Sequence, residues 1–179
     1  GSFLGRINMD LREGKHWSYG VNGGFQRAEF AAPYLMRAPV QADKTGPAIT
    51  SLQQEISAFV GDKPLTQAEF DRSITGAIRS LAGNFETAGD VLGAMQANDL
   101  FKRPDNYYST ITARYKALTL PALNQAISKA IDPAKAIWVV VGNAATVKPQ
   151  LDAIGLPVEV MPAASVASSP QDATAPAAK

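Results

Sequence analysis

Helical patterns fill the middle of this sequence and strand patterns lie at its two ends, and this order restricts the fold more than any other feature. Between residues 43 and 131 apolar side chains recur every three or four positions in successive stretches. Strand patterns precede this region at 17–40 and follow it at 136–141 and 158–161. Because a parallel sheet needs strands and helices that alternate along the chain, grouped strands and helices predict an α+β fold. We expect an antiparallel-rich sheet packed on one side by several helices.

The first two strands are predicted on either side of a glycine-rich turn. Large and small side chains alternate through residues 17–22, and the two glycines at 23–24 break the alternation. A second, antiparallel strand is expected from residue 25 or 30 to Val40, where two prolines favour bulges. The stretch 20–24 resembles a phosphate-binding loop only loosely, because it lacks the Gly-Lys-Ser/Thr ending and opens no helix. A hairpin turn is the better interpretation.

Capping and turn residues divide the helical region into separate helices. The strongest start signal is the capping box from Thr66 to Glu69, which opens a helix predicted to run to Phe85. The helices predicted from such signals lie at 6–13, 45–60, 66–85, 87–100, 106–118, 121–131 and 146–154.

Two apolar stretches near the C-terminal end predict further strands. Residues 136–141 form an unbroken run rich in branched side chains, typical of a buried strand, and 158–161 form a last short one. Because three or four strands make a thin sheet, and the chain opens within a helical pattern, we expect a further strand and a helix of this domain upstream of Gly1. From residue 162 the sequence is mostly Ala, Ser and Pro with little to bury, so we predict a domain of residues 1–161 and a disordered tail, 162–179.

The composition excludes several kinds of functional site. The 179 residues include no cysteine and a single histidine, His16. Disulfide scaffolds, thiolate metal sites, cysteine nucleophiles and any zinc site that needs two histidines from this chain are therefore excluded. The formal net charge is +1 and the basic residues are dispersed, which gives no reason to expect a nucleic-acid or anionic membrane partner. No stretch approaches the roughly 20 apolar residues that a membrane span needs.

Arg12 and Tyr19 are the residues that best suit chemistry in this sequence. Arg12 lies on the last turn of the first predicted helix and Tyr19 on the strand that follows, so the junction allows both to face one cleft. A guanidinium and a phenol are suitable donors to a peptide carbonyl or a developing oxyanion. The alternative, which spacing alone favours, is that Arg12 caps helix carbonyls while Tyr19 packs in the sheet with its hydroxyl bonded. We expect His16 to be a solvated or helix-capping group rather than a catalytic one.

Residues 1–20 resemble a characteristic stretch of the insulinase/pitrilysin metallopeptidases, from a later domain of that family that binds no zinc. The matching pieces are Arg-Ile-Asn at 6–8, Leu-Arg-Glu at 11–13 and Ser-Tyr-Gly at 18–20. Similar steps follow at 40–49, at 64–70 and at 139–143, where Val-Val-Val-Gly-Asn stands for the family's Val-Val-Gly-Asp strand end. The resemblance extends over about residues 1–161.

The resemblance implies that catalysis is divided between two halves of a peptidase. Family members form a clam-shaped chamber of four α+β domains, in which the N-terminal half binds zinc through a His-x-x-Glu-His motif. The C-terminal half supplies an Arg and a Tyr seven positions apart that contact the substrate near the scissile bond. Arg12 and Tyr19 match that pair in type and spacing. The resemblance therefore identifies the chain as part of a C-terminal, substrate-binding domain.

The departure from the family is that this sequence has no His-x-x-Glu-His motif. The resemblance then implies that zinc is bound by another half or a partner subunit, and that this chain alone is not an enzyme. The expected partners are that zinc-binding half and a peptide substrate. The alternative is a catalytically inactive structural or peptide-binding subunit of the same fold, while the match over 1–20 argues against an unrelated binding module. Relatives with such a tail and no cysteine are often bacterial and exported, which favours a periplasmic or secreted location.

Overall fold

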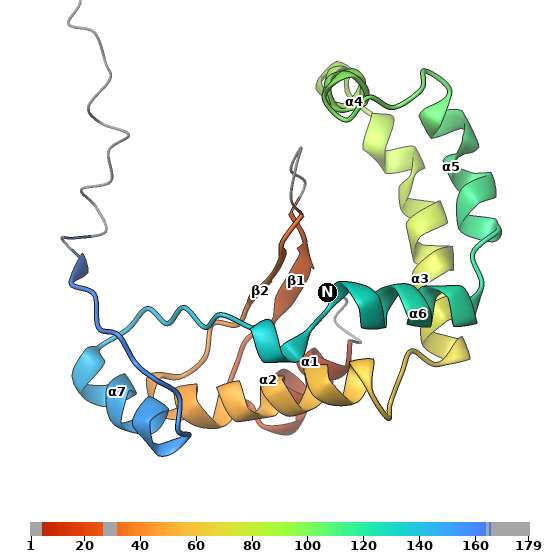
Figure 1. Cartoon of the computed structure of the whole chain (residues 1–179). Coiled ribbons are helices and arrows are strands. Elements are labelled where there is room, and N and C mark those ends of the chain that lie inside the picture. The colour runs from red at the N-terminus through yellow and green to blue at the C-terminus, as the bar shows by residue number, and fades with distance from the viewer. Residues whose placement is uncertain (1–4, 27–31, 164, 166–179) are drawn as a thin grey trace, which may run out of the picture.

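The computed structural model describes residues 5–26, 32–163 and 165, and its elements are arranged around the long helix α2 (Figure 1). The helices are α1 (Arg6–Asn8), α2 (Thr45–Val60), α3 (Gln67–Ser80), α4 (Ala88–Leu100), α5 (Tyr107–Lys116), α6 (Leu120–Ala130) and α7 (Ala144–Ala153). A π-helical turn, η1 (Met9–Gly14), continues α1, and 3-10 turns lie at η2 (Ala42–Lys44), η3 (Ala82–Phe85) and η4 (Pro133–Lys135). A small antiparallel sheet beside these helices confirms the predicted α+β class.

The described sheet is a hairpin of two strands, β1 (Asn22–Phe25) and β2 (Tyr34–Arg37), paired antiparallel along their whole length. An isolated bridge between Ser18 and Val40 extends the pairing toward η1. In Figure 1 the hairpin stands above α2. The sheet is therefore smaller than predicted within the described residues.

The position predicted for the first strand and its turn is wrong. The sequence pattern predicts a strand at 17–22 and a break at 23–24, but both glycines lie inside β1. A Cβ on Gly23 would lie 2.8 Å from the Tyr34 hydroxyl oxygen, so this glycine leaves room for the Tyr34 ring across the hairpin rather than turning the chain. The connection between the strands includes residues 27–31, which lie outside the described part, as does that portion of the predicted second strand.

The core lies where α2 meets η1 and the hairpin. Four buried side chains form it, Leu11, Val21, Ala48 and Leu52. Partly buried hydrophobic side chains pack against this cluster from the surrounding segments, namely Ile7, Trp17, Met36, Ala38, Val40 and Trp138. Helix α7 packs against α2 at one end, whereas α3, α4 and α5 form an arm that rises from its other end (Figure 1).

The helix starts predicted at Thr66 and Thr87 are confirmed, whereas α2 begins at Thr45 with Lys44 at its N-cap and without the side-chain cap expected from Asp43 or Thr45. The capping box at the start of α3 is present, with the Thr66 side chain bonded to the Glu69 N–H and the Glu69 side chain to the Thr66 N–H. A second box, Thr87 with Asp90, opens α4. Helix α3 ends at Ser80, short of the predicted Phe85, because a 3-10 turn containing a glycine and an asparagine follows it.

Both strands predicted near the C-terminal end are wrong. Residues 136–141 and 158–161 belong to no strand of the described chain. The first segment is not buried either, since most of its side chains face solvent. Branched residues indicate a preference for extended backbone, but a strand also needs a hydrogen-bonding partner, and a local pattern cannot show whether one is present.

The remaining fold predictions concern the ends of the chain and its relation to membranes. The predicted tail, 162–179, lies outside the described residues except for 162, 163 and 165. The strand and helix expected upstream of Gly1 stay a prediction. Among the described residues, none of the helices has the length and apolar character that crossing a membrane requires.

Arg6 fastens the first helical turn to the start of α3. Its Nε and Nη2 donate to the two carboxylate oxygens of Glu69, at 2.7 and 2.6 Å, and its other N–H groups reach the carbonyls of Lys63 and Pro64. Glu69 also accepts from the Thr66 N–H and hydroxyl. The bonds from Arg6, more than those from Thr66, lower the pKa of Glu69 from 4.5 to about 2.

This pKa makes the stability of the chain depend on pH in acid, and Glu69→Gln should remove the dependence. Because the folded-state pKa lies below the unfolded value, ionised Glu69 stabilises the folded state above about pH 5, and the contribution is lost as the pH falls toward 2. We expect the free energy of unfolding of the natural chain to exceed that of the variant by about 1.5 kcal/mol at pH 7. The difference is no larger because solvent partly screens the ion pair of Arg6 and Glu69. The difference should close near pH 2.

Urea unfolding followed by tryptophan fluorescence at several pH values measures this difference. The control is Glu159→Gln, because the exposed Glu159 makes no ion pair or hydrogen bond in the described part of the chain. A Glu69→Gln difference that stays constant from pH 7 to pH 2 would contradict the assignment.

Candidate functional site

A tight reversal of the backbone brings Arg12 and Tyr19 together. The turn η1 is π-helical, since the Lys15 N–H bonds to the Asp10 carbonyl five residues back. Such π-turns are frequent at functional sites. His16 then takes a left-handed backbone, with φ of 56°. Its ring Nδ1 lies 3.0 Å from the Arg12 carbonyl oxygen, which confirms the predicted capping role of His16. The reversal turns the chain from the helix directly into the segment that carries Tyr19.

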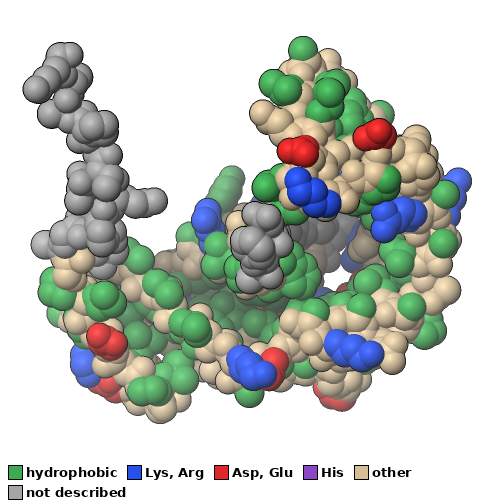
Figure 2. Space-filling model, turned by 45° about the horizontal axis from the view of Figure 1, so that its top comes forward, with side chains coloured by type: hydrophobic (Ala, Val, Ile, Leu, Met, Phe, Trp, Pro, Cys, Tyr) green, Lys and Arg blue, Asp and Glu red, His purple; other side chains and the backbone are tan. Residues whose placement is uncertain are grey.

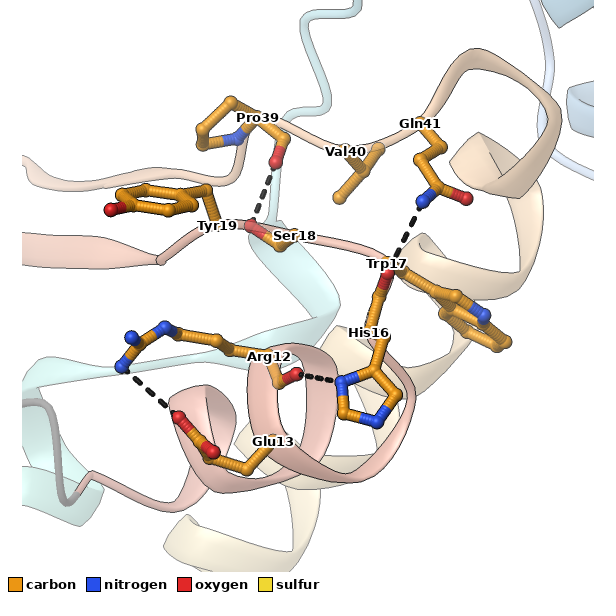
Figure 3. Close-up of a pocket in the computed structure, with 9 residues that line it drawn as sticks. All are labelled: Arg12, Glu13, His16, Trp17, Ser18, Tyr19, Pro39, Val40 and Gln41. Carbon is orange, nitrogen blue, oxygen red and sulfur yellow. Dashed lines mark hydrogen bonds and ion pairs between the residues drawn. The ribbon is translucent and has the colours of Figure 1, made fainter.

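Leu11 holds this reversal from the inside. Its side chain is fully buried in the core. Its carbonyl accepts hydrogen bonds from the N–H groups of both Trp17 and Ser18, at 2.9 and 3.3 Å. Because Leu11 points inward, its neighbour Arg12 is placed on the outer side of η1 (Figure 3).

Asn8 holds the strand side of the reversal. Its Oδ1 accepts from the Val21 N–H at 2.6 Å, and its Nδ2 donates to the Val21 carbonyl at 3.1 Å. Both residues are buried. One asparagine side chain thus takes the place of a neighbouring strand and fixes the chain two residues beyond Tyr19.

Arg12 and Tyr19 lie together at the mouth of an open hollow (Figure 3). The guanidinium carbon is 5.8 Å from the centre of the Tyr19 ring, within the range of a cation–π contact. Arg12 Nη1 also lies 3.1 Å from Glu13 Oε1. Tyr19 is 88% exposed, and its hydroxyl makes no hydrogen bond within the described residues. The alternative in which Tyr19 packs in the sheet with its hydroxyl bonded is therefore wrong.

The hollow has a volume of about 630 Å³ and is lined by two segments of chain. Its lining residues are Arg12, Glu13, His16, Trp17, Ser18, Tyr19, Pro39, Val40 and Gln41. The two segments are joined by a bond from Ser18 Oγ to the Pro39 carbonyl at 2.7 Å and by one from Gln41 Nε2 to the His16 carbonyl at 3.2 Å. No sequence pattern marks Ser18, Pro39 and Gln41 as site residues, because only the pairing of the two segments brings them to this place.

The site offers hydrogen-bond donors rather than metal ligands. No three His, Cys, Asp or Glu side chains lie together as a possible metal site anywhere in the residues that the structure describes. The zinc that the family resemblance implies does not fit the residues of this chain, which has one histidine and no cysteine. The guanidinium and the phenol can instead bind an oxygen that carries full or partial negative charge.

Comparison with known proteins finds a similar solved structure. No protein-family model matches the chain, and no curated protein matches it. The chain is similar to a solved structure described as the peptidase M16 inactive domain from Pseudomonas fluorescens, with a TM-score of 0.65 and 24% sequence identity. The alignment covers 75% of this chain. The chain has the fold of a peptidase M16 domain.

The M16 fold agrees with the resemblance found in residues 1–20. The match covers 32% of the Pseudomonas fluorescens chain, so this chain spans about a third of that protein's length. The C-terminal position, the clam-shaped chamber and the substrate contacts that the resemblance implies stay predictions.

Proposed function

We propose that this chain is a non-catalytic, peptide-binding domain of the M16 fold, which binds an extended peptide on the face that carries Arg12 and Tyr19. The observation that carries the proposal is the exposed Arg12–Tyr19 pair at the mouth of the hollow. The ring of Tyr19 restrains the guanidinium, and its hydroxyl is open to a ligand. Both groups donate hydrogen bonds, and an extended peptide presents a carbonyl oxygen at every residue.

The proposal assigns any metal chemistry to another polypeptide. With one histidine and no cysteine, the sequence cannot form the His-x-x-Glu-His zinc motif. The similar Pseudomonas fluorescens structure is itself described as an inactive domain, which supports a non-catalytic role for this chain. The expected partners are therefore a peptide and a homologous, zinc-binding domain or subunit.

Substitution of Arg12 should weaken peptide binding. The probe is a fluorescein-labelled nonapeptide of alanine, valine and lysine with blocked ends, and fluorescence anisotropy with the full chain gives Kd. We expect Arg12→Ala to raise Kd about tenfold or more, because a hydrogen bond from a charged donor is worth roughly 1.5–3 kcal/mol. Tyr19→Phe should raise Kd about threefold, since it removes one neutral donor and keeps the ring.

The matched control is Arg103→Ala. Arg103 also lies over a tyrosine ring, with its guanidinium carbon 4.4 Å from the centre of Tyr107, but it is far from the hollow in the sequence and does not line it. The control should bind the peptide as the natural chain does. Equal Kd values for Arg12→Ala and Arg103→Ala would overturn the proposal.

A second candidate function is a direct part in peptide hydrolysis within a larger assembly. The unbonded Tyr19 hydroxyl beside a guanidinium favours it, because such donors stabilise an oxyanion. In an assembly with a zinc-binding partner, Arg12→Ala would then lower kcat about a hundredfold while peptide affinity changed little. A loss confined to affinity supports the non-catalytic proposal instead.

A further inference from the structure

A carboxylate of the chain itself lies beside the guanidinium of the candidate site. Arg12 Nη1 is 3.1 Å from Glu13 Oε1, and both residues line the hollow. In Figure 3 the guanidinium lies between the Tyr19 ring and the Glu13 carboxylate. The positive group that the site offers to a ligand is therefore bordered by a negative one.

Glu13 is the one acidic side chain among the nine described residues that line the hollow. The other acid of η1, Asp10, is paired with Lys15, whose Nζ lies 2.8 Å from Asp10 Oδ2. Glu13 is thus the carboxylate that a ligand meets when it approaches Arg12.

The ion pair of Arg12 and Glu13 is looser than that of Arg6 and Glu69. Arg6 reaches both oxygens of Glu69 at 2.7 and 2.6 Å. The contact between Arg12 and Glu13 is longer, and their side chains are 30 and 50% exposed. An exposed pair of this kind contributes little stability. Because a guanidinium has five N–H donors, a ligand oxygen can share Arg12 with Glu13.

A backbone carbonyl and a carboxylate would meet Glu13 differently. A carbonyl has no net charge, so it can accept from Arg12 and Tyr19 while Glu13 stays in place. A carboxylate binds a guanidinium best through two oxygens, and to do so here it must lie beside Glu13 or displace it. Displacement keeps the two negative charges close, because Glu13 is the next residue in the chain and makes no other ion pair or hydrogen bond in the described part.

The overall charge of the chain is nearly balanced. The formal net charge is +1, and on the face drawn in Figure 2 the acidic and basic side chains are scattered rather than gathered by sign. Long-range attraction of a ligand depends on net charge and on large patches of one sign. Selection of a ligand by its charge is therefore decided by the groups at the hollow.

We propose that Glu13 is a specificity residue, which makes the site bind the neutral carbonyl of an internal peptide bond and discriminate against carboxylates. The favoured ligand is an internal stretch of polypeptide without acidic side chains, whereas a free C-terminus or an acidic stretch is disfavoured. This proposal rests on the proposed function, because it names which peptides the Arg12–Tyr19 face binds. The competing view is that Glu13 only blocks Arg12, in which case its substitution would raise the affinity for all peptides alike.

Two peptides that differ in charge test the selection. They derive from the labelled nonapeptide of alanine, valine and lysine, with every alanine replaced by glutamate in one and by glutamine in the other. Fluorescence anisotropy with the full chain gives the ratio of the two Kd values. In the natural chain the glutamate peptide should have the higher Kd. Glu13→Gln should lower the ratio of the glutamate to the glutamine value about tenfold, because it removes a like charge a few ångströms from the ligand.

The matched control is Glu159→Gln, which changes the net charge equally at an exposed residue outside the lining of the hollow. It should leave the ratio unchanged. Because Glu13 is exposed as well, neither substitution should disturb folding. Salt gives a second measurement: at about 0.5 M NaCl the screening length falls to roughly 4 Å, so the effect of Glu13→Gln should shrink.

The outcomes separate this proposal from the one on which it rests. If the natural chain binds the glutamine peptide but Glu13→Gln leaves the ratio unchanged, or Glu159→Gln changes it equally, the selection by Glu13 is overturned and peptide binding stands. An effect of Glu13→Gln that salt does not reduce would also overturn the selection. If the natural chain binds neither peptide, the proposed function is overturned and the selection with it.

Discussion

Asn8→Ala should lower the free energy of unfolding by about 3 kcal/mol. The substitution leaves the N–H and the carbonyl of Val21 without partners, and Val21 is only 4% exposed. Each buried polar group left unsatisfied costs roughly 1–3 kcal/mol. Because the hydrogen bonds of Asn8 also fix the chain next to Tyr19, the variant should bind peptide more weakly even after correction for its unfolded fraction. Urea unfolding at pH 7 measures the stability.

Asn124→Ala is the matched control for this prediction. Asn124 makes the same two bonds to a backbone, accepting from the Leu65 N–H at 3.0 Å and donating to the Leu65 carbonyl at 3.2 Å. This pair is only partly buried, so water can replace the lost side chain, and the expected cost is about 1 kcal/mol. Equal losses from the two variants would contradict the view that burial makes Asn8 the more important residue.

The helices could be predicted from the sequence because their signals are local. The capping box of Thr66 and Glu69 satisfies backbone groups within the same turn, so four residues carry the information. Asn143 likewise accepts from the Ala145 N–H and sets the start of α7, two residues before the predicted position. Errors in the helices are therefore confined to their ends.

The strands could not be predicted equally well, because pairing depends on distant residues. Gly23 reads locally as part of a turn, but the structure uses it to accommodate Tyr34 from the other strand. The run from 136 to 141 has the composition of a buried strand, yet its burial requires a partner that no local pattern specifies. Side chains that alternate with a period of two indicate an extended backbone. They do not indicate which other strand pairs with it.

The candidate site lies between these two cases. The residues Arg12 and Tyr19 were identifiable from their types, their spacing and the family resemblance. Their contact, however, depends on the buried Leu11 and on the left-handed backbone of His16, and no sequence pattern indicates that backbone. The site is thus attached to the core through a single turn. Substitutions inside the core should therefore alter the arrangement of Arg12 and Tyr19 at the surface.

Replacing Leu11 by alanine tests that connection and should cost about 3 kcal/mol of stability. Leu11 is the fully buried side chain at the centre of the core, with an exposed fraction of 0%. Truncation of a buried leucine removes apolar contacts and leaves a cavity, a loss that ranges from about 2 to 5 kcal/mol. Alanine has the higher helix propensity, so the loss cannot come from the turn itself.

Two further variants separate the volume of Leu11 from its other properties. Leu11→Met keeps the volume and should cost less than about 1.5 kcal/mol, whereas Leu92→Ala, at a site 56% exposed, should change stability by no more than about 0.5 kcal/mol. If the cavity also loosens η1, Leu11→Ala should raise the Kd for the labelled peptide while Leu11→Met leaves it unchanged. A Leu11→Ala loss no larger than that of Leu92→Ala would show that the core does not hold the Arg12–Tyr19 turn in place.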